Sequence, residues 1–135
     1  MKLKLLFLAI FISTALVAQE TKTTPPVIVA KIALGETVHF ENTAVTFKQV
    51  MEDSRCPKDV DCIWAGQAKV LVAVKANSTS IEKELIFHGT NFGTERENTL
   101  FVSETRTYIG YRLSPYPLSS VSPDKRNYFL EVYLK

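Results

Sequence analysis

Apolar residues recur at every second position over most of the chain after residue 26, which is the period of a β-strand with one buried face. The clearest run covers residues 62–75, where the even positions are apolar or small and the odd positions include Gln67, Lys69 and Lys75. Shorter alternating runs lie at residues 28–34, 38–40, 45–47, 85–88, 100–102, 109–113 and 128–134. No segment has a helical period, so the sequence predicts an all-β domain.

The connections between these runs are short and polar, with turns expected at residues 41–43 and 77–80. The apolar phase slips at Gln49 and Val50, which predicts a β-bulge. Seven or eight short strands with one polar face each are typical of antiparallel sheets packed face to face. We therefore expect residues 27–135 to form a single antiparallel β-sandwich, immunoglobulin-like, with a partly open β-barrel as the alternative.

Residues 1–18 have the pattern of a secretory signal peptide. Two lysines precede an apolar run at residues 5–12, and small residues lead to a cleavage point after Ala18 or Gln19. The apolar run is too short for a comfortable membrane span. Residues 19–26 are polar and end in two prolines, which predicts a flexible leader. We expect an exported protein, periplasmic or extracellular, with no membrane span after signal removal.

The charge balance changes once the signal is removed. The chain has 16 Lys and Arg against 14 Asp and Glu, and two of the lysines belong to the signal, which leaves 14 against 14. Proteins that bind nucleic acid or an anionic membrane surface carry a basic excess or a basic stripe. The neutral mature chain has neither, so we do not expect a nucleic-acid partner.

The two cysteines, Cys56 and Cys62, lie in a connection between predicted strands. In an oxidising compartment such a pair is expected to form a disulfide. The alternative is a free thiol pair that binds a soft metal such as copper(I), although two thiolates are few ligands. The strand phase puts Cys62 on the same side as Trp64, and Trp64 is in phase with Val70 and Val72, which predicts a core position for the indole.

The segment around the cysteines resembles a signature, E-D-S-R-C-P-x-x-V-x-C-x-W-A-G, of small secreted bacterial proteins that are uncharacterised as a group. The match runs from Glu52 to Ala68. The resemblance implies secretion and a β fold. It implies no catalytic or ligand-binding residues.

The same segment holds a group of acidic side chains that could gather around Ca²⁺ or another cation, because hard cations prefer several oxygen ligands. These candidates are Glu52, Asp53, Asp59 and Asp61. Arg55 and Lys58 lie among them and favour a solvated loop with internal ion pairs instead.

Five residues are candidates for an interaction surface. Arg55 and Lys58 would be presented by a stiff, cross-linked loop, which also suggests a protease inhibitor, since rigidity lowers the ordering cost of binding. Tyr108, Phe129 and Tyr133 fall opposite the apolar rows of their strands. As neighbours they would form an exposed aromatic strip, which can mark a binding surface; loops that cover them, or a different strand phase, are the alternative.

The sequence contains no nucleophile elbow and no phosphate-binding loop, and it indicates no cofactor. We therefore expect a non-enzymatic, exported module that binds a protein or an envelope component. A metal-binding module that uses the acidic residues and a protease inhibitor that presents the cross-linked loop are the alternative functions.

Overall fold

A computed structural model describes residues 27–89 and 97–135, so the expected signal peptide and leader lie outside the described residues. The described residues form eight strands and one short 3₁₀ helix. In chain order the elements are β1 (Val27–Ala33), β2 (Thr37–Phe40), β3 (Thr43–Asp53), β4 (Gln67–Ala76), β5 (Thr79–His88), β6 (Thr99–Val102), β7 (Thr107–Ser114), η2 (Pro123–Lys125) and β8 (Phe129–Leu134). This part of the chain has no helix with the length and apolar content of a membrane span.

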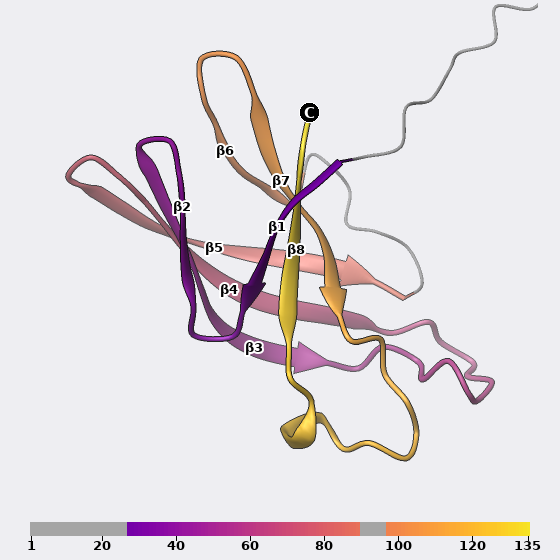
Figure 1. Cartoon of the computed structure of the whole chain (residues 1–135). Helices are drawn as coiled ribbons and strands as arrows, with labels where there is room; N and C mark the ends of the chain where they lie inside the picture. The colour runs from indigo at the N-terminus through magenta and orange to yellow at the C-terminus, as the bar shows by residue number, and fades with distance from the viewer. Residues whose placement is uncertain (1–26, 90–96) are drawn as a thin grey trace, which may run out of the picture.

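The strands form two antiparallel four-stranded sheets, with the orders β1-β8-β7-β6 and β2-β3-β4-β5. In Figure 1, β8 crosses in front of β3, β4 and β5, and β1 crosses in front of β5. The predicted all-β sandwich of antiparallel strands is confirmed. Its connectivity differs from the Greek-key pattern of an immunoglobulin domain, because β2 to β5 follow one another as a meander and β1 pairs with the last strand of the chain.

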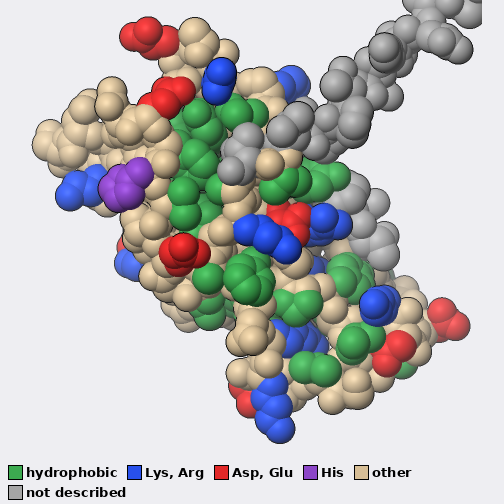
Figure 2. Space-filling view, viewed as in Figure 1, with side chains coloured by type: hydrophobic (Ala, Val, Ile, Leu, Met, Phe, Trp, Pro, Cys, Tyr) green, Lys and Arg blue, Asp and Glu red, His purple; other side chains and the backbone are tan. Residues whose placement is uncertain are grey.

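The core lies between the two sheets and is built from the inward positions of each strand. On β4, the alternate residues Ala68, Val70 and Val72 have no exposed surface, while the residues between them are partly exposed. Figure 2 shows apolar side chains gathered beside β2, where the two sheets diverge. Phe40 of β2 and Phe101 of β6 are half-buried there, with their ring centroids 6.1 Å apart.

Two bulges decide which residues of β3 face the interior. The register against β4 shifts after Phe47 and again after Val50. Each extra residue reverses the face that the following side chains occupy, so the inward row runs through Phe47, Val50 and Asp53. The predicted bulge at Gln49 and Val50 is confirmed. The second bulge was not predicted, and it turns Asp53 rather than Glu52 toward the interior.

The predicted strand from residue 62 starts five residues too early, because β4 begins at Gln67. Gly66 has a φ of +68°, and a Cβ atom at this position would lie 1.8 Å from the carbonyl oxygen of Ser54. The chain therefore turns at Gly66 in a conformation that only glycine fits. Residues 62–65 lie outside the sheet, and the predicted core position of Trp64 is wrong, since its side chain is 82% exposed.

The predicted exposed aromatic strip is also wrong. Tyr108 and Tyr133 are buried, and Phe129 is half-buried. A register shift after Gly110 reverses the phase of β7, so Tyr108 points inward and its ring stacks on Phe101 at a centroid distance of 4.3 Å. Tyr133 packs edge-on against Tyr111 at 5.4 Å.

Asn98 closes part of the open edge of β5. The side chain is fully buried, and its amide donates to the carbonyl oxygen of Ile86 at 2.8 Å and accepts from the Ile86 backbone N–H at 2.9 Å. The Asn98 side chain therefore makes the pair of hydrogen bonds with Ile86 that the backbone of a neighbouring strand would otherwise make. Unpaired strand edges are open to pairing with other chains. Asn98 gives the backbone groups of Ile86 a partner within the domain, and it fixes the start of β6 beside β5.

Candidate functional site

Two long connections meet at one end of the sandwich. The β3–β4 connection, residues 54–66, carries both cysteines and is called the disulfide loop here; the β7–β8 connection covers residues 115–128. Figure 1 shows both at the end of the molecule where β3 ends and β4 begins. The backbone N–H of Lys58 donates to the carbonyl oxygen of Pro117 at 3.1 Å, so the two loops are in direct contact.

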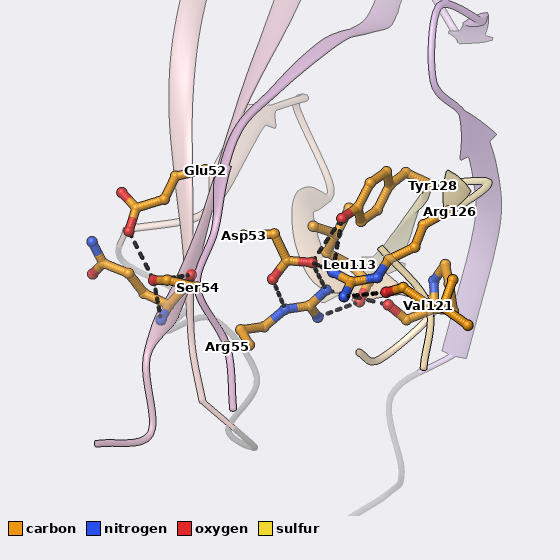
Figure 3. Close-up of polar contacts among 10 residues, drawn as sticks. Glu52, Asp53, Ser54, Arg55, Leu113, Val121, Arg126 and Tyr128 are labelled. Carbon is orange, nitrogen blue, oxygen red and sulfur yellow. Dashed lines mark hydrogen bonds and ion pairs between the residues drawn. The ribbon is translucent and has the colours of Figure 1, made fainter. Parts of the chain in front are cut away.

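The side chain of Asp53, at the end of β3, is 1% exposed and accepts hydrogen bonds from three other side chains (Figure 3). Arg55 binds it with two nitrogens, Nε to Oδ1 at 2.7 Å and Nη2 to Oδ2 at 2.9 Å. Oδ2 also accepts from Nη1 of Arg126 at 2.9 Å and from the hydroxyl of Tyr128 at 2.8 Å. We call these four residues the Asp53 cluster.

Three further hydrogen bonds from the two arginines reach carbonyl oxygens on the β7–β8 side of the molecule, while Nε of Arg126 is buried without a partner. Nη1 of Arg55 donates to the carbonyl oxygen of Leu113 at 2.7 Å, and its Nη2 donates to that of Pro115 at 3.2 Å. Nη2 of Arg126 donates to the carbonyl oxygen of Val121 at 2.9 Å. Charge-assisted and bidentate bonds of this kind are the strongest hydrogen bonds in proteins. The Asp53 cluster therefore fixes the base of the disulfide loop against the β7–β8 loop.

Arg55 is 4% exposed, which corrects its assignment to an interaction surface. A residue buried in this way cannot enter the pocket of a protease, so only Lys58 remains exposed from the basic pair of the inhibitor hypothesis. Arg126 and Tyr128 were not among the predicted site residues. Both are distant from Asp53 in sequence, by 73 and 75 residues, and no local pattern links them.

The cluster also sets the ionisation of Asp53. Burial by itself would raise the pKa of this carboxyl group, but the hydrogen bonds and positive charge of Arg55, with further contributions from Tyr128 and Arg126, hold it below the ordinary value. Burial raises the pKa of the Tyr128 hydroxyl. Asp53 is thus ionised, and both of its oxygens are occupied by donors, so its role is to hold the loops together.

We expect the domain to lose stability in acid. A carboxyl group whose pKa is lower in the folded state stabilises that state above its unfolded pKa, and this contribution disappears as the pH falls through the folded pKa. For Asp53 the loss begins near the unfolded value of 3.8. Glu131 acts in the same direction, because Arg112 and Ser114 outweigh the effect of burial and lower its pKa. Urea unfolding at about pH 6 and about pH 3 measures the difference, and an equal free energy of unfolding at both would contradict the assignment.

Cys56 and Cys62 form a disulfide, as predicted, so neither thiol is available for copper(I). Asp59, inside this ring, fixes the disulfide loop at another point. Its Oδ1 accepts from the backbone N–H of Ser119 at 2.9 Å and its Oδ2 from the Ser119 hydroxyl at 2.5 Å. The disulfide, Asp59 and the Asp53 cluster together hold the loop in one position.

Reduction of the disulfide is expected to lower stability without unfolding the domain at room temperature. The ring is small, with a sequence separation of 6, so the loss should be at most about 2.4 kcal/mol by loop-closure entropy. Thermal unfolding with and without a reducing agent measures this difference. Complete unfolding on reduction at room temperature would show instead that the fold depends on the bond.

The four predicted acidic ligands do not converge on one point. Asp53 and Asp59 are held in the contacts described above. Glu52 points outward and accepts from the Ser54 hydroxyl at 2.8 Å, and Asp61 is exposed. Among residues 27–89 and 97–135, no group of three or more His, Cys, Asp and Glu side chains is placed to hold a metal ion. Three of the four carboxylates, those of Glu52, Asp53 and Asp59, accept hydrogen bonds from other residues at this end of the molecule.

The disulfide loop exposes three large apolar residues beside the exposed charged residues Lys58, Asp59 and Asp61. Ile63 is 95% exposed, Trp64 is 82% exposed and Val60 is 45% exposed; these three residues are called the tip here. The exposure of the tip was not predicted, because the predicted strand included residues 62–66. The available signal was Gly66, since a glycine inside a strand pattern often marks an irregular backbone or a close approach.

Comparisons with protein-family models, with curated proteins and with solved structures found no match for this chain.

Proposed function

We propose that this protein is an exported, non-enzymatic interaction module that contacts a component of the cell envelope through the tip of its disulfide loop. The observation that carries the proposal is the near-complete exposure of Ile63 and Trp64 on a loop held by buried ion pairs and a disulfide. Export is supported by the signal pattern of residues 1–18 and by the disulfide, which persists in oxidising compartments.

The exposed apolar side chains of the tip would gain free energy if a partner buried them. Burying a large apolar side chain is worth about 1.5–3 kcal/mol, and the fold leaves two adjacent residues of this kind in water. Tryptophan is among the residues that most often dominate binding energy in interfaces. Because the Asp53 cluster already orders the loop, binding through the tip would incur little additional ordering cost.

Substitution at the tip should weaken binding and leave the fold intact. We expect Trp64→Ala and Ile63→Ser to change the free energy of unfolding by no more than about 0.5 kcal/mol, since both side chains are exposed. Each should weaken the apparent affinity of the purified mature domain for the native envelope fraction by about tenfold or more, as for a hot-spot residue. Sedimentation of the domain with that fraction measures the affinity.

The matched control is Val102→Ser. Val102 is an apolar residue that is 68% exposed at the end of β6, in the hairpin with β7 that projects away from the disulfide loop (Figure 1). This variant should bind as the parent does. Equal binding by all four proteins, or no binding by the parent, would refute the assignment of the tip as the contact surface.

A further inference from the structure

We infer that the component contacted by the tip is the lipid bilayer surface, with Ile63 and Trp64 placed at the boundary between headgroups and acyl chains. This inference rests on the proposed function and specifies its partner.

The shape of the tip favours a lipid surface over a protein partner. A side chain that is 95% exposed, as in Ile63, makes almost no contact with its own chain, and the neighbouring Trp64 is 82% exposed. The tip therefore projects from the surface. A projecting pair of apolar side chains can enter a lipid surface without a complementary cavity, because lipids rearrange around it. A protein partner would need a matching pocket.

The projecting segment has the composition of a membrane-contacting surface. The consecutive residues Cys62, Ile63, Trp64 and Ala65 are all exposed, and none carries a charge. Tryptophan is enriched at membrane–water interfaces because its ring is apolar at one end and donates a hydrogen bond at the other. The same run offers no charged or hydroxyl side chain to pair with polar groups at the rim of a protein interface.

The base of the tip limits how deeply the loop can enter a membrane. The carbonyl oxygen of Ala65 accepts from Cys56 N, and that of Gly66 accepts from Gly89 N, so these backbone groups are already satisfied within the fold. Lys58, Asp59 and Asp61 are exposed nearby, and they carry one positive and two negative charges. Charges of both signs at the base of the tip favour contact with zwitterionic headgroups over an anionic surface. Because burying a charge is costly, only the apolar side chains of the tip are expected to enter the membrane.

The apolar surface of the tip is small. Stable protein–protein interfaces bury about 20–30 residues on each side, whereas the tip consists of three apolar residues. Membrane attachment by a small apolar group is weak and reversible, as it is even for a single acyl chain. The tip is therefore suited to reversible attachment of a folded domain to a membrane surface.

The experiment uses the full mature chain and vesicles of phosphatidylcholine. Trp64 is the only tryptophan of the chain, so its fluorescence reports on the tip without labelling. We expect a saturable shift of emission to shorter wavelength when vesicles are added, and quenching when the acyl chains carry bromine. Ile63→Ser should lower the partition coefficient by about fivefold or more, because one apolar side chain no longer leaves water. Val102→Ser should leave it unchanged.

Three results would overturn the inference. If vesicles change neither the emission nor the sedimentation of the domain, while the domain still sediments with the native envelope fraction, the partner is a protein or another envelope component and the proposed function stands. If the domain binds neither, the proposed function fails as well. If it binds only anionic vesicles, equally well in the parent and in Ile63→Ser, charge rather than the tip causes attachment.

Discussion

Replacing Asp53 with alanine is expected to lower the free energy of unfolding by about 3–5 kcal/mol, the loss typical of breaking a buried ion pair from one side. The variant would leave the guanidinium groups of Arg55 and Arg126 in the interior with no carboxylate between them. Their side chains are 2% and 7% exposed, so water could not replace the lost partner without opening the loops. For a domain with a total stability of about 5–15 kcal/mol, this loss would be a large fraction.

Urea unfolding of Asp53→Ala, followed by far-ultraviolet circular dichroism, measures the effect. Glu52→Ala is the matched control, because Glu52 is the preceding residue, has the same charge and points outward, with a side chain that is 42% exposed. The control should lose no more than about 0.5–1 kcal/mol, as exposed ion pairs do. Equal losses in the two variants would mean that the inward turn of Asp53 has no energetic consequence.

Asn98→Ala should have the next largest effect, a loss of about 3 kcal/mol. The substitution removes two hydrogen bonds and leaves both the N–H and the carbonyl group of Ile86 without a partner, and each unsatisfied buried group costs about 1–3 kcal/mol. The fully buried side chain also leaves a small cavity. Stability should fall, and the amide of Ile86 should exchange its hydrogen faster than in the parent.

Asn127→Ala is the control for this substitution, because Asn127 is exposed and lies before β8. It should change stability by no more than about 0.5 kcal/mol. If Asn98→Ala were as stable as this control, or if exchange at Ile86 were unchanged, the strand-edge role of Asn98 would be refuted.

The strands were predictable because each sheet buries one face, and this imposes a period of two on the sequence. The pattern on β4, with valines at positions 70, 72 and 74, follows directly from its inward face. The disulfide was predictable from the spacing of two cysteines in one connection. These features depend on neighbouring residues alone, so a single sequence is sufficient to find them.

The residues of the site were harder to predict because strand phase depends on bulges. One bulge in β3 was visible in the sequence, but the second, after Val50, determines that Asp53 is buried. A bulge after Gly110 likewise turns Tyr108 inward. The partner of Asp53 at Arg126 is 73 residues away, and only the packing of the two sheets brings them together.

The segment from Glu52 to Ala68 divides into two parts in this structure. Asp53, Arg55 and Gly66 have structural roles, since the first two form the buried ion pair and the glycine permits the close approach to Ser54. Ile63 and Trp64 have no such role, because they contact almost nothing in the folded chain. The structural residues thus hold in place a short apolar surface that is available to a partner.

The most direct test of this account is the accessibility of Trp64 to a soluble quencher, acrylamide, in the isolated protein. Trp64 is 82% exposed, and it is the only tryptophan of the chain. The quenching constant of the native protein should therefore be close to that of the protein unfolded in urea, with emission near that of an indole in water. Strong protection of the native protein, with emission at shorter wavelength, would show that the indole is buried and would contradict the account.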